Sequence, residues 1–303
     1  MHRKIKIILN PMADMGNAWR VARDLRSITE EHGGIEWSGT VYPGHAIQLA
    51  KQAEGYDMVI AMGGDGTVHE VMNGLMQIPP EMRPILGIVP VGSGNDFGHG
   101  IGASTTPTVA LKRAIEGEPS TVDLALMTDQ HGRREYFDNT LGIGFGAIVT
   151  IRSHRLPLLR GFLMYLSAVL QTILLDHNPI TMQIETDTEK WTQKVIYLVL
   201  CNGPREGGGF LIAPEARIDD GILHYAMITD VSRLMMFRIV PEVMKGTHGR
   251  FKQVKMGTCK KFTIQADRPL YIHADGEIFS GPGTDLRQVS FEVLPNALKV
   301  VRG

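Results

Sequence analysis

The chain has 303 residues, of which 43% are hydrophobic and 21% charged, and its formal net charge is −1. This composition is too apolar for a disordered protein, and the near-zero charge supplies no global positive field to attract nucleic acid. The two cysteines, Cys201 and Cys259, have neither metal-ligand spacing nor the number for a disulfide framework, which fits a reducing cytoplasm.

Roughly the first 120 residues alternate strand-like and helical segments. Short apolar runs that stop at glycine or proline indicate buried strands, and apolar residues at three- and four-residue spacing indicate helices between them. The expected strands are 5–9, 35–41, 57–62 and 85–89, and the expected helices are 18–28, 46–53 and 68–76. This alternation predicts a parallel sheet with helices on both faces.

After Pro119 the pattern changes to short strands broken by Gly, Asp and Pro. Examples are 195–200, 221–228, 261–266 and 289–294, with helical insertions at about 158–175 and 232–244. Such spacing is typical of an antiparallel sandwich or barrel. We therefore predict an α/β domain over residues 1–122 and a mainly β domain over 123–303, with the C-terminal tail able to return to the first domain.

The chain is expected to be cytoplasmic. The apolar run Ile5–Leu9 is too short for a signal-peptide core, and the uncharged stretch Gly161–Leu175 is shorter than the ~20 residues that span a bilayer. Arg152 and Arg155 precede the apolar segment Leu156–Leu175, a combination that can meet an anionic membrane surface from the inside of the cell. Packing of that helix on the sheet is the alternative.

The strongest local motif is Gly63-Gly64-Asp65-Gly66-Thr67, placed between a strand and a helix. Glycines let the backbone approach a ligand closely, and the N-terminus of the helix favours a phosphate. Thr67 and Glu70 have capping-box spacing, which predicts where the helix starts. No lysine follows as in a Walker A loop, and Asp65 can hold Mg²⁺ against nucleotide phosphates. An ordinary strand-to-helix turn is the alternative.

A second loop, Pro90-Val91-Gly92-Ser93-Gly94-Asn95-Asp96-Phe97, follows the strand at 85–89. Ser93 and the glycine amides can donate to phosphate, and Asp96 can join Asp65 in an acidic group that organises a metal. The alternative is a loop whose Asn-Asp pair caps a helix.

Together these motifs resemble the diacylglycerol kinase catalytic-domain family, which includes sphingosine and ceramide kinases and bacterial lipid kinases. The likeness runs over nearly the whole chain. Gly63–Thr67 is shared with NAD kinases and phosphofructokinases, whereas Pro90–Phe97 resembles the Pro-x-Gly-Thr-x-Asn-Asp-Phe segment of lipid kinases, with Ser93 in the threonine place. The resemblance implies a three-layer α/β nucleotide-binding domain, as in NAD kinases and phosphofructokinases, followed by an antiparallel β-sandwich.

The resemblance also implies a nucleotide site. Asn10-Pro11-Met12-Ala13-Asp14 is similar to the family's Asn-Pro-x-Ser/Ala-Gly loop, with Asp14 in place of glycine, and Thr40 resembles a threonine that contacts nucleotide. An Asp65–Asp96–Asp123 network would hold Mg-ATP between the domains. The residues expected to bind ATP are Asn10, Pro11, Thr40, Gly63, Gly64, Asp65, Gly66, Thr67, Glu70, Gly92, Ser93, Asn95 and Asp96.

In the second domain, the glycine-rich segment 202–216 and the turn Arg217–Ile222 resemble family motifs. In related bacterial kinases the equivalent turn holds a structural Mg²⁺, which implies a carboxylate ligand from Asp220 and carbonyl ligands from Arg217 and Ile222. The alternatives are a long hairpin loop and a plain Asp-Gly turn.

Asp275-Gly276-Glu277 resembles the family's catalytic segment. Phosphoryl transfer needs a carboxylate to take the proton of the acceptor hydroxyl. Glu277 is the first candidate for this role and Asp275 the second, although sequence spacing alone does not decide between them. Asp65 completes the predicted catalytic set. An Asp-Gly hairpin is the alternative.

We therefore expect an ATP- and Mg²⁺-dependent lipid kinase of phospholipid metabolism that transfers the γ-phosphoryl group to diacylglycerol or a similar lipid. Phosphatidylglycerol, a sphingoid base and an isoprenoid-like alcohol stay open as acceptors. The expected partners are ATP and the lipid, without nucleic acid, and a homodimer is compatible with the sequence. The alternatives are an NAD kinase or other small-molecule kinase, and a catalytically silent lipid- or nucleotide-binding regulator.

Overall fold

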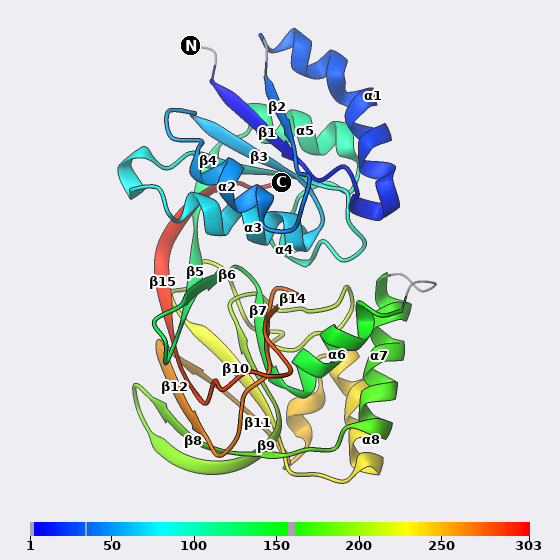
Figure 1. Ribbon diagram of the computed structural model, residues 1–303, viewed down its shortest axis with the longest axis vertical. Helices are drawn as coiled ribbons and strands as arrows, with labels where there is room; N and C mark the ends of the chain where they lie inside the picture. The colour runs from blue at the N-terminus through cyan, green and yellow to red at the C-terminus, as the bar shows by residue number, and fades with distance from the viewer. Residues whose placement is uncertain (1–2, 34, 157–160) are drawn as a thin grey trace. The chain divides into compact units, whose positions relative to one another are not determined.

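The computed structural model describes residues 3–33, 35–156 and 161–303. The chain divides into two compact units, Met1–Val122 with Asn296–Gly303, and Asp123–Pro295 (Figure 1). Two strands, β5 (Pro119–Asp129) and β15 (Gln288–Val301), each begin in one unit and end in the other. Within the described residues, no helix is both long enough and apolar enough to cross a membrane.

The first unit is built on a parallel sheet. Its order is β2 (Glu36–Gly39), β1 (Ile5–Leu9), β3 (Met58–Gly63), β4 (Ile85–Pro90) and the end of β15. Each neighbouring pair is parallel. Every residue of β1 and β3 is buried, as expected where both faces of a sheet are covered. All of them are apolar except Lys6, whose Nζ lies 3.4 Å from the Glu36 carboxylate.

Helices cover the two faces of this sheet and make three layers (Figure 1). α1 (Asn17–Glu31) and α5 (Pro107–Glu116) share one core with the side chains of Ile7 and Ile60. α2 (His45–Lys51) and α3 (Asp65–Leu75) pack against each other and take the other face. The short segments η1 (Ala13–Gly16), η2 (Pro80–Met82) and α4 (Asp96–Gly100) lie in the connections.

The end of the chain completes the first unit. Val300 pairs with Leu86 of β4 in a parallel register. The Arg83 guanidinium donates to the Ala297 carbonyl at 2.7 Å, and the Gly303 N–H donates to the Ile101 carbonyl at 2.9 Å. The sheet therefore needs residues from both ends of the sequence.

The second unit is a β-sandwich. Its central strand, β9 (Lys190–Cys201), pairs antiparallel with three other strands, β7 (Thr140–Gly144), β8 (Ile180–Thr186) and β10 (Leu223–Thr229). The remaining strands are β6 (Arg134–Phe137), β11 (Val254–Cys259), β12 (Lys261–Ala266), β13 (Ile272–Ala274) and β14 (Glu277–Ser280). Inward side chains such as Leu198 and Phe262 form one continuous core.

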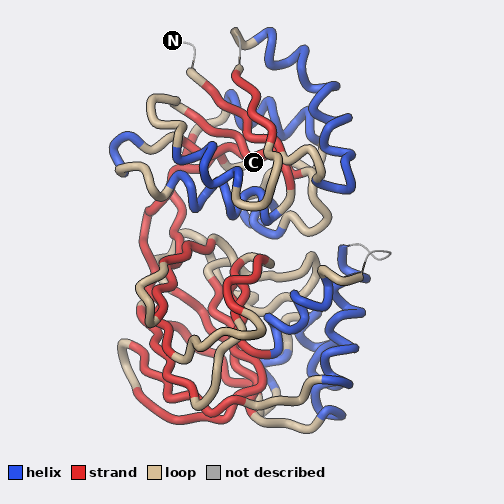
Figure 2. The backbone as a smooth tube through the Cα atoms, in the orientation of Figure 1, coloured by secondary structure: helices blue, strands red, loops and turns tan. Residues whose placement is uncertain are grey.

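Three helices cover the outer face of β9, as the blue segments beside the red strands in Figure 2 show. They are α6 (Phe145–Ser153), α7 (Gly161–Leu175) and α8 (Arg233–Met244), and the 3-10 turn η3 (His248–Arg250) follows α8. Leu198 and Leu200 face the sandwich core, whereas the alternate residues Tyr197 and Val199 face the helices. Successive side chains of a strand point to opposite faces, so this apolar strand packs on both of them.

This architecture confirms the predicted fold class, an α/β unit and a β-sandwich. The sequence analysis did not anticipate α6, because its β-branched run Ile148-Val149-Thr150-Ile151 has the composition of a strand. The helix predicted at about 158–175 is observed over Gly161–Leu175, and the positions 158–160 lie outside the described residues.

The contact between α2 and α3 depends on the absence of a side chain at Gly74. A Cβ atom there would lie 2.3 Å from the Ile47 carbonyl oxygen and 2.7 Å from the Ala50 Cβ. We expect Gly74→Ala to lower the free energy of unfolding of the first unit by about 1–3 kcal/mol through overpacking, measured by urea denaturation. Gly39→Ala, where nothing lies within 4 Å, is the matched control and should be near neutral. Equal stability of the two variants would contradict this packing.

Candidate active site

Loops that follow parallel strands bring the predicted nucleotide residues to one edge of the first unit's sheet. The chain runs from β1 to β2 on one side and then to β3 on the other, so the strand order reverses between β1 and β3. Ligands of open α/β sheets bind at such a reversal, outside the carboxyl ends of the strands. The loops and first helical turns at this edge contain Asn10, Pro11, Thr40, Gly63, Gly64, Asp65, Gly66, Thr67, Gly92, Ser93, Asn95 and Asp96.

The backbones that follow β3 and β4 touch at two glycines. A Cβ atom on Gly92 would lie 2.4 Å from the Cα of Gly64, and one on Gly64 would lie 3.1 Å from the Cα of Gly92. The Val91 N–H also donates to the Gly63 carbonyl at 2.8 Å. Non-bonded carbons normally lie about 3.5–4.0 Å apart, so a side chain at Gly92 would push the two loops apart.

Asn95 closes the loop after β4. Its Oδ1 accepts the Gly92 N–H at 3.0 Å, and its Nδ2 donates to the Gly92 carbonyl at 2.7 Å. Asn95 has a φ of 53°, a left-handed conformation that asparagine adopts more readily than most residues. The Gly92 N–H is thus used within the loop, while Ser93 is exposed to solvent.

Two carboxylates converge on Gly94. A Cβ atom there would lie 2.6 Å from Oδ2 of Asp65 and 3.8 Å from Oδ2 of Asp96. Asp65 is the first residue of α3, where negative charge is favourable next to the helix N-terminus. Mg²⁺ is commonly held by one or two carboxylates together with phosphate oxygens. The donor set of this pair therefore fits Mg-ATP.

The predicted capping box at Thr67 and Glu70 is wrong. α3 begins at Asp65 with Gly64 as its N-cap. The two oxygens of the Glu70 carboxylate instead accept the N–H groups of Gly44 at 2.7 Å and Ala46 at 3.1 Å, and so cap α2. The spacing of Thr67 and Glu70 predicted that Glu70 would cap its own helix, whereas in the folded chain Glu70 caps the neighbouring helix. The contact of Glu70 with ATP stays a prediction.

The loop after β1 contains an aspartate, Asp14, in a left-handed backbone conformation that glycine adopts more easily. Asp14, which stands where the family has glycine, has a φ of 48°, in the left-handed region. The Asn10 N–H donates to the Met62 carbonyl at 3.0 Å, and the Thr40 N–H donates to the Leu9 carbonyl at 2.8 Å. These bonds hold the ends of β1, β2 and β3 together at the nucleotide edge.

In the second unit, Asp275 organises the turn between β13 and β14. Its Oδ1 accepts the N–H groups of Asn139 and Thr140, and its Oδ2 accepts that of Asp138, each at 3.0 Å. Asp275 is buried and has a φ of 49°. The carboxylate therefore fixes the segment that leads into β7, while Glu277, two residues on, is exposed at the start of β14.

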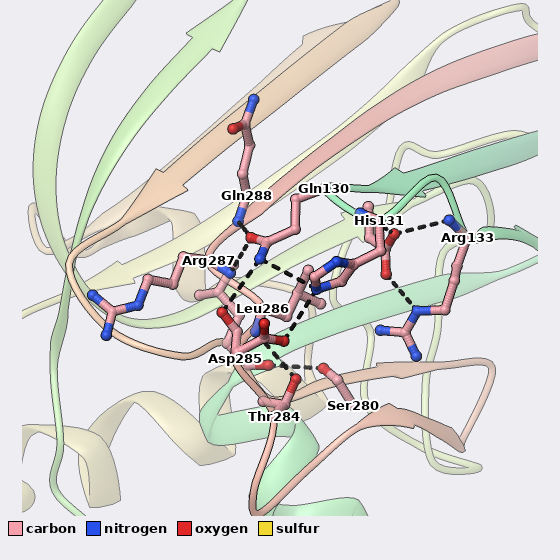
Figure 3. Close-up of polar contacts among 11 residues, drawn as sticks. Gln130, His131, Arg133, Ser280, Thr284, Asp285, Leu286, Arg287 and Gln288 are labelled. Carbon is pink, nitrogen blue, oxygen red and sulfur yellow. Dashed lines mark hydrogen bonds and ion pairs between the residues drawn. The ribbon is translucent and has the colours of Figure 1, made fainter.

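Polar contacts that Figure 3 shows join the turn between β5 and β6 to the segment that follows β14. Gln130 Oε1 accepts the N–H groups of Arg287 and Gln288, and His131 lies 3.1 Å from the Asp285 carboxylate. The Arg133 guanidinium lies 4.6 Å from the ring centroid of Phe279 in β14. Of these contacts, the one between Arg133 and Phe279 reaches β14, the strand that begins with Glu277.

Arg133 is itself held by Asp129. The Asp129 carboxylate accepts the N–H groups of His131 and Arg133 at 2.9 Å and the Arg133 Nε at 2.6 Å. Burial would raise the pKa of Asp129, but these hydrogen bonds and the charge of Arg133 outweigh it and hold the pKa below its usual range. The carboxylate is therefore a stable anchor for the Arg133 side chain.

The turn expected to hold a structural Mg²⁺ is organised by aspartates. Asp123 Oδ2 accepts the Gly221 N–H at 2.6 Å, and Asp220 Oδ1 accepts the Ile222 N–H at 3.1 Å. Within the ranges that the structure describes, no group of three or more His, Cys, Asp or Glu side chains has the arrangement of a metal site. A site here would depend on carbonyl oxygens, such as those of Arg217 and Ile222, and it stays a prediction. The proposed grouping of Asp123 with Asp65 and Asp96 joins residues of two units and also stays a prediction.

Sequence reasoning missed a buried polar cluster around Glu206. Its Oε2 accepts the Tyr197 hydroxyl at 2.8 Å, its Oε1 accepts the Tyr165 hydroxyl, and His273 Nε2 lies 3.1 Å from Oε1. Burial alone would raise the pKa of Glu206, but the charge of His273 and the hydrogen bonds outweigh it, so the pKa lies below its usual range. Only a charged residue inside a glycine-rich loop hinted at this cluster in the sequence.

An apolar cavity lies between β9, β10 and the helices α6, α7 and α8. Tyr165 and Tyr197, two members of the Glu206 cluster, contribute to its wall. The other lining residues are Phe145, Gly146, Val149, Val169, Phe210, Ile212, Ile228, Met236, Ile239, Val240 and Val243. Nearly all of these side chains are apolar, which is the surface chemistry that hydrocarbon prefers.

Comparisons with known proteins match both units. Residues 4–127 match the diacylglycerol kinase catalytic domain, and residues 139–302 match the YegS C-terminal NAD kinase beta sandwich-like domain. The chain is 37% identical over 248 residues to the "Probable lipid kinase YegS-like" protein of Chromohalobacter salexigens, across 80% of this chain and 76% of that protein. It is 29% identical over 308 residues to a diacylglycerol kinase of Mycobacterium tuberculosis, across 99% and 95% of the two chains.

Solved structures share the fold. A diacylglycerol kinase from Bacillus anthracis str. Sterne aligns with a TM-score of 0.73 at 20% identity, across 99% of this chain and 97% of that one. An NAD kinase from Archaeoglobus fulgidus in complex with ATP aligns with a TM-score of 0.54 at 13% identity, across 98% and 93%. At these identities the likeness concerns the fold alone.

The contact between Gly64 and Gly92 makes a prediction for nucleotide binding. We expect Gly92→Ala to raise the Kd for ATP about 10-fold. The added Cβ atom would force the two loops apart, and such overpacking costs about 1–3 kcal/mol. Isothermal titration measures this. Gly100→Ala, in the adjoining α4 with nothing within 4 Å, should bind ATP as the unmodified protein does. An unchanged Kd in Gly92→Ala would show that the contact does not shape the site.

Proposed function

The chain belongs to the family of lipid kinases that join a diacylglycerol kinase catalytic domain to a YegS C-terminal domain, and on this premise we propose that it transfers the γ-phosphoryl group of ATP to a hydroxyl of diacylglycerol or a similar lipid. The observation that best supports a lipid as the acceptor is the apolar lining of the cavity in the second unit. Membership of a kinase family implies ATP as the phosphoryl donor.

Asp65 and Asp96 are proposed to hold Mg-ATP. Their oxygens converge on Gly94 at the carboxyl edge of the parallel sheet, where the N-terminus of α3 also favours a phosphate. Mg²⁺, when bound, would neutralise charge as the phosphoryl group moves. The flexible glycine backbones at Gly63 and Gly64 let the phosphates approach the sheet edge closely.

Glu277 is the proposed base for the acceptor hydroxyl. Asp275 already accepts three backbone N–H groups, and a carboxylate so bonded is a weak proton acceptor because those bonds favour its charged form. Glu277 lies exposed on the same hairpin. The structure therefore favours Glu277 as the base and Asp275 as the residue that shapes the turn. The structural Mg²⁺ at Arg217, Asp220 and Ile222 is retained as part of the proposal.

The outer face of α7 supports a peripheral contact with a membrane. Leu163, Leu174 and Leu175 are 63%, 58% and 64% exposed, and Leu234 at the start of α8 is 75% exposed. Exposed leucines grouped on neighbouring helices are costly in water. A bilayer would cover them and would also present the lipid acceptor.

A transfer assay tests the proposed function. With labelled ATP and Mg²⁺, we expect transfer to diacylglycerol in detergent micelles and none to NAD. Glu277→Gln should lower kcat by about 10²–10⁴-fold, the usual worth of a general base, at an unchanged Tm. Glu189→Gln, an exposed glutamate of the β8–β9 turn, is the matched control and should retain activity.

Other results of this assay would point elsewhere. Transfer to NAD and to none of the lipids would indicate a small-molecule kinase. ATP-dependent transfer to no acceptor at all would indicate a silent binding protein. A Glu277→Gln variant of full activity would exclude Glu277 as the base.

Filling the cavity tests its role in acceptor binding. We expect Val169→Phe, which adds volume inside the cavity, to raise the KM for a long-chain diacylglycerol about 10-fold while the KM for ATP stays constant. Leu170→Phe, at the next position of α7 where the side chain is 38% exposed, should leave both constants unchanged. Equal KM values for the two variants would place the acyl chain elsewhere.

A further inference from the structure

The Glu206 cluster, defined as Glu206, His273, Tyr165 and Tyr197, joins separate elements of the second unit. Tyr165 lies on α7, Tyr197 on β9 and His273 on β13, while Glu206 belongs to the loop that follows β9. The side chains of Glu206 and His273 are 6% and 0% exposed. A carboxylate that deep in a protein needs partners for its charge, and here each of these elements supplies one.

Glycines on neighbouring elements make room for the cluster. A Cβ atom on Gly142 would lie 2.2 Å from His273 Nε2, one on Gly146 would lie 2.5 Å from the Tyr197 ring, and one on Gly207 would lie 2.7 Å from the Tyr165 ring. Side chains at any of these positions would displace a member. The cluster thus has a tightly defined geometry and does not simply fill a gap in the core.

One side of the cluster connects to the catalytic turn. His273 is on β13, two residues before Asp275. The Asp275 carboxylate holds the Asn139 N–H, and the Asn139 Nδ2 donates at 2.7 Å to the carbonyl of Arg205, the residue that precedes Glu206. These hydrogen bonds run from the loop to the turn, and the 3.1 Å approach of His273 Nε2 to Glu206 Oε1, which is not aligned as a hydrogen bond, completes the ring.

The other side of the cluster connects to the cavity. The rings of Tyr165 and Tyr197 line the cavity wall while their hydroxyls donate to Glu206. A chain lying in the cavity therefore touches the same side chains that hold Glu206. Replacing the cluster with apolar residues would keep the packing but remove this directional link between wall and turn.

We propose that Glu206 and His273 are positioning residues, which hold the Asp275–Glu277 turn at a fixed place relative to the cavity that takes the acyl chain. The proposal rests on the proposed lipid kinase function. Phosphoryl transfer depends on alignment, and a displacement of about 1 Å can cost about 100-fold in rate. The cluster secures that alignment without touching the reacting atoms itself.

Glu206→Gln tests the role, because it keeps the shape of the side chain and removes its charge. We expect kcat for diacylglycerol to fall about 10- to 100-fold, with the KM for ATP unchanged. Tyr165→Phe, which removes one hydroxyl and keeps the ring in the cavity wall, should give a smaller fall in the same direction. It also serves if Glu206→Gln does not fold.

The matched control is Glu242→Gln. Glu242 is likewise a nearly buried carboxylate, with a side chain 12% exposed. It accepts the Thr247 hydroxyl at 2.5 Å and pairs with Arg250 at 2.9 Å, both beyond the end of α8. It should lose stability with kcat unchanged. A fall in kcat as large as that of Glu206→Gln would reduce the Glu206 cluster to a purely structural role and overturn the proposal.

Amide hydrogen exchange separates this inference from the proposed function. The N–H groups of Asn139 and Thr140, which Asp275 accepts, should exchange faster in Glu206→Gln and at the native rate in Glu242→Gln. If the unmodified protein phosphorylates no lipid, the proposed function fails, and this exchange still reports whether the cluster holds the turn. Native exchange rates in Glu206→Gln would overturn the positioning role.

Discussion

The close approach of Gly64 and Gly92 is the contact on which the loops at the carboxyl edge of the parallel sheet depend. It brings two loops of the parallel sheet together with no side chain between them. Asp65 and Asp96, each next to one of these loops, can then face the same backbone position at Gly94. A Cβ atom on Gly92 would overlap the backbone of Gly64, and one on Gly64 would lie unusually close to Gly92, so the loops would move apart and the carboxylates would separate with them. The positions of the two carboxylates thus depend on the absence of side chains at Gly64 and Gly92.

Several carboxylates of the family-like motifs accept backbone N–H groups and so stabilise turns and helix ends. Asp275 accepts three N–H groups, Asp123 holds the turn at Gly221, and Glu70 in the first unit caps α2. Acidic residues in family motifs are therefore not all candidates for proton transfer. Glu277 is exposed at the start of β14, whereas Asp275 beside it is buried. One motif thus contains a carboxylate that accepts backbone N–H groups and another that faces solvent.

Several parts of the fold could be predicted because local sequence and tertiary environment agree. Ile5–Leu9 and 58–62 are apolar except for Lys6, and both lie in buried strands. Agreement fails at α6, where the β-branched run of 148–151 folds as a helix because it packs beneath α7. It also fails at Glu70, whose partner comes from α2. In both places packing against a neighbouring helix outweighs a local preference.

By itself, the sequence determined the two-part architecture and the motifs at the nucleotide edge, because periodicity and glycine placement are local properties. Its resemblance to a kinase family also rests on such motifs, which are short and contiguous. Only the tertiary structure decided that Asp275 accepts three backbone N–H groups and that Glu206, His273 and two tyrosines meet beside an apolar cavity. Those residues are far apart along the chain, and nothing in their spacing encodes which of them a folded sandwich will bury together.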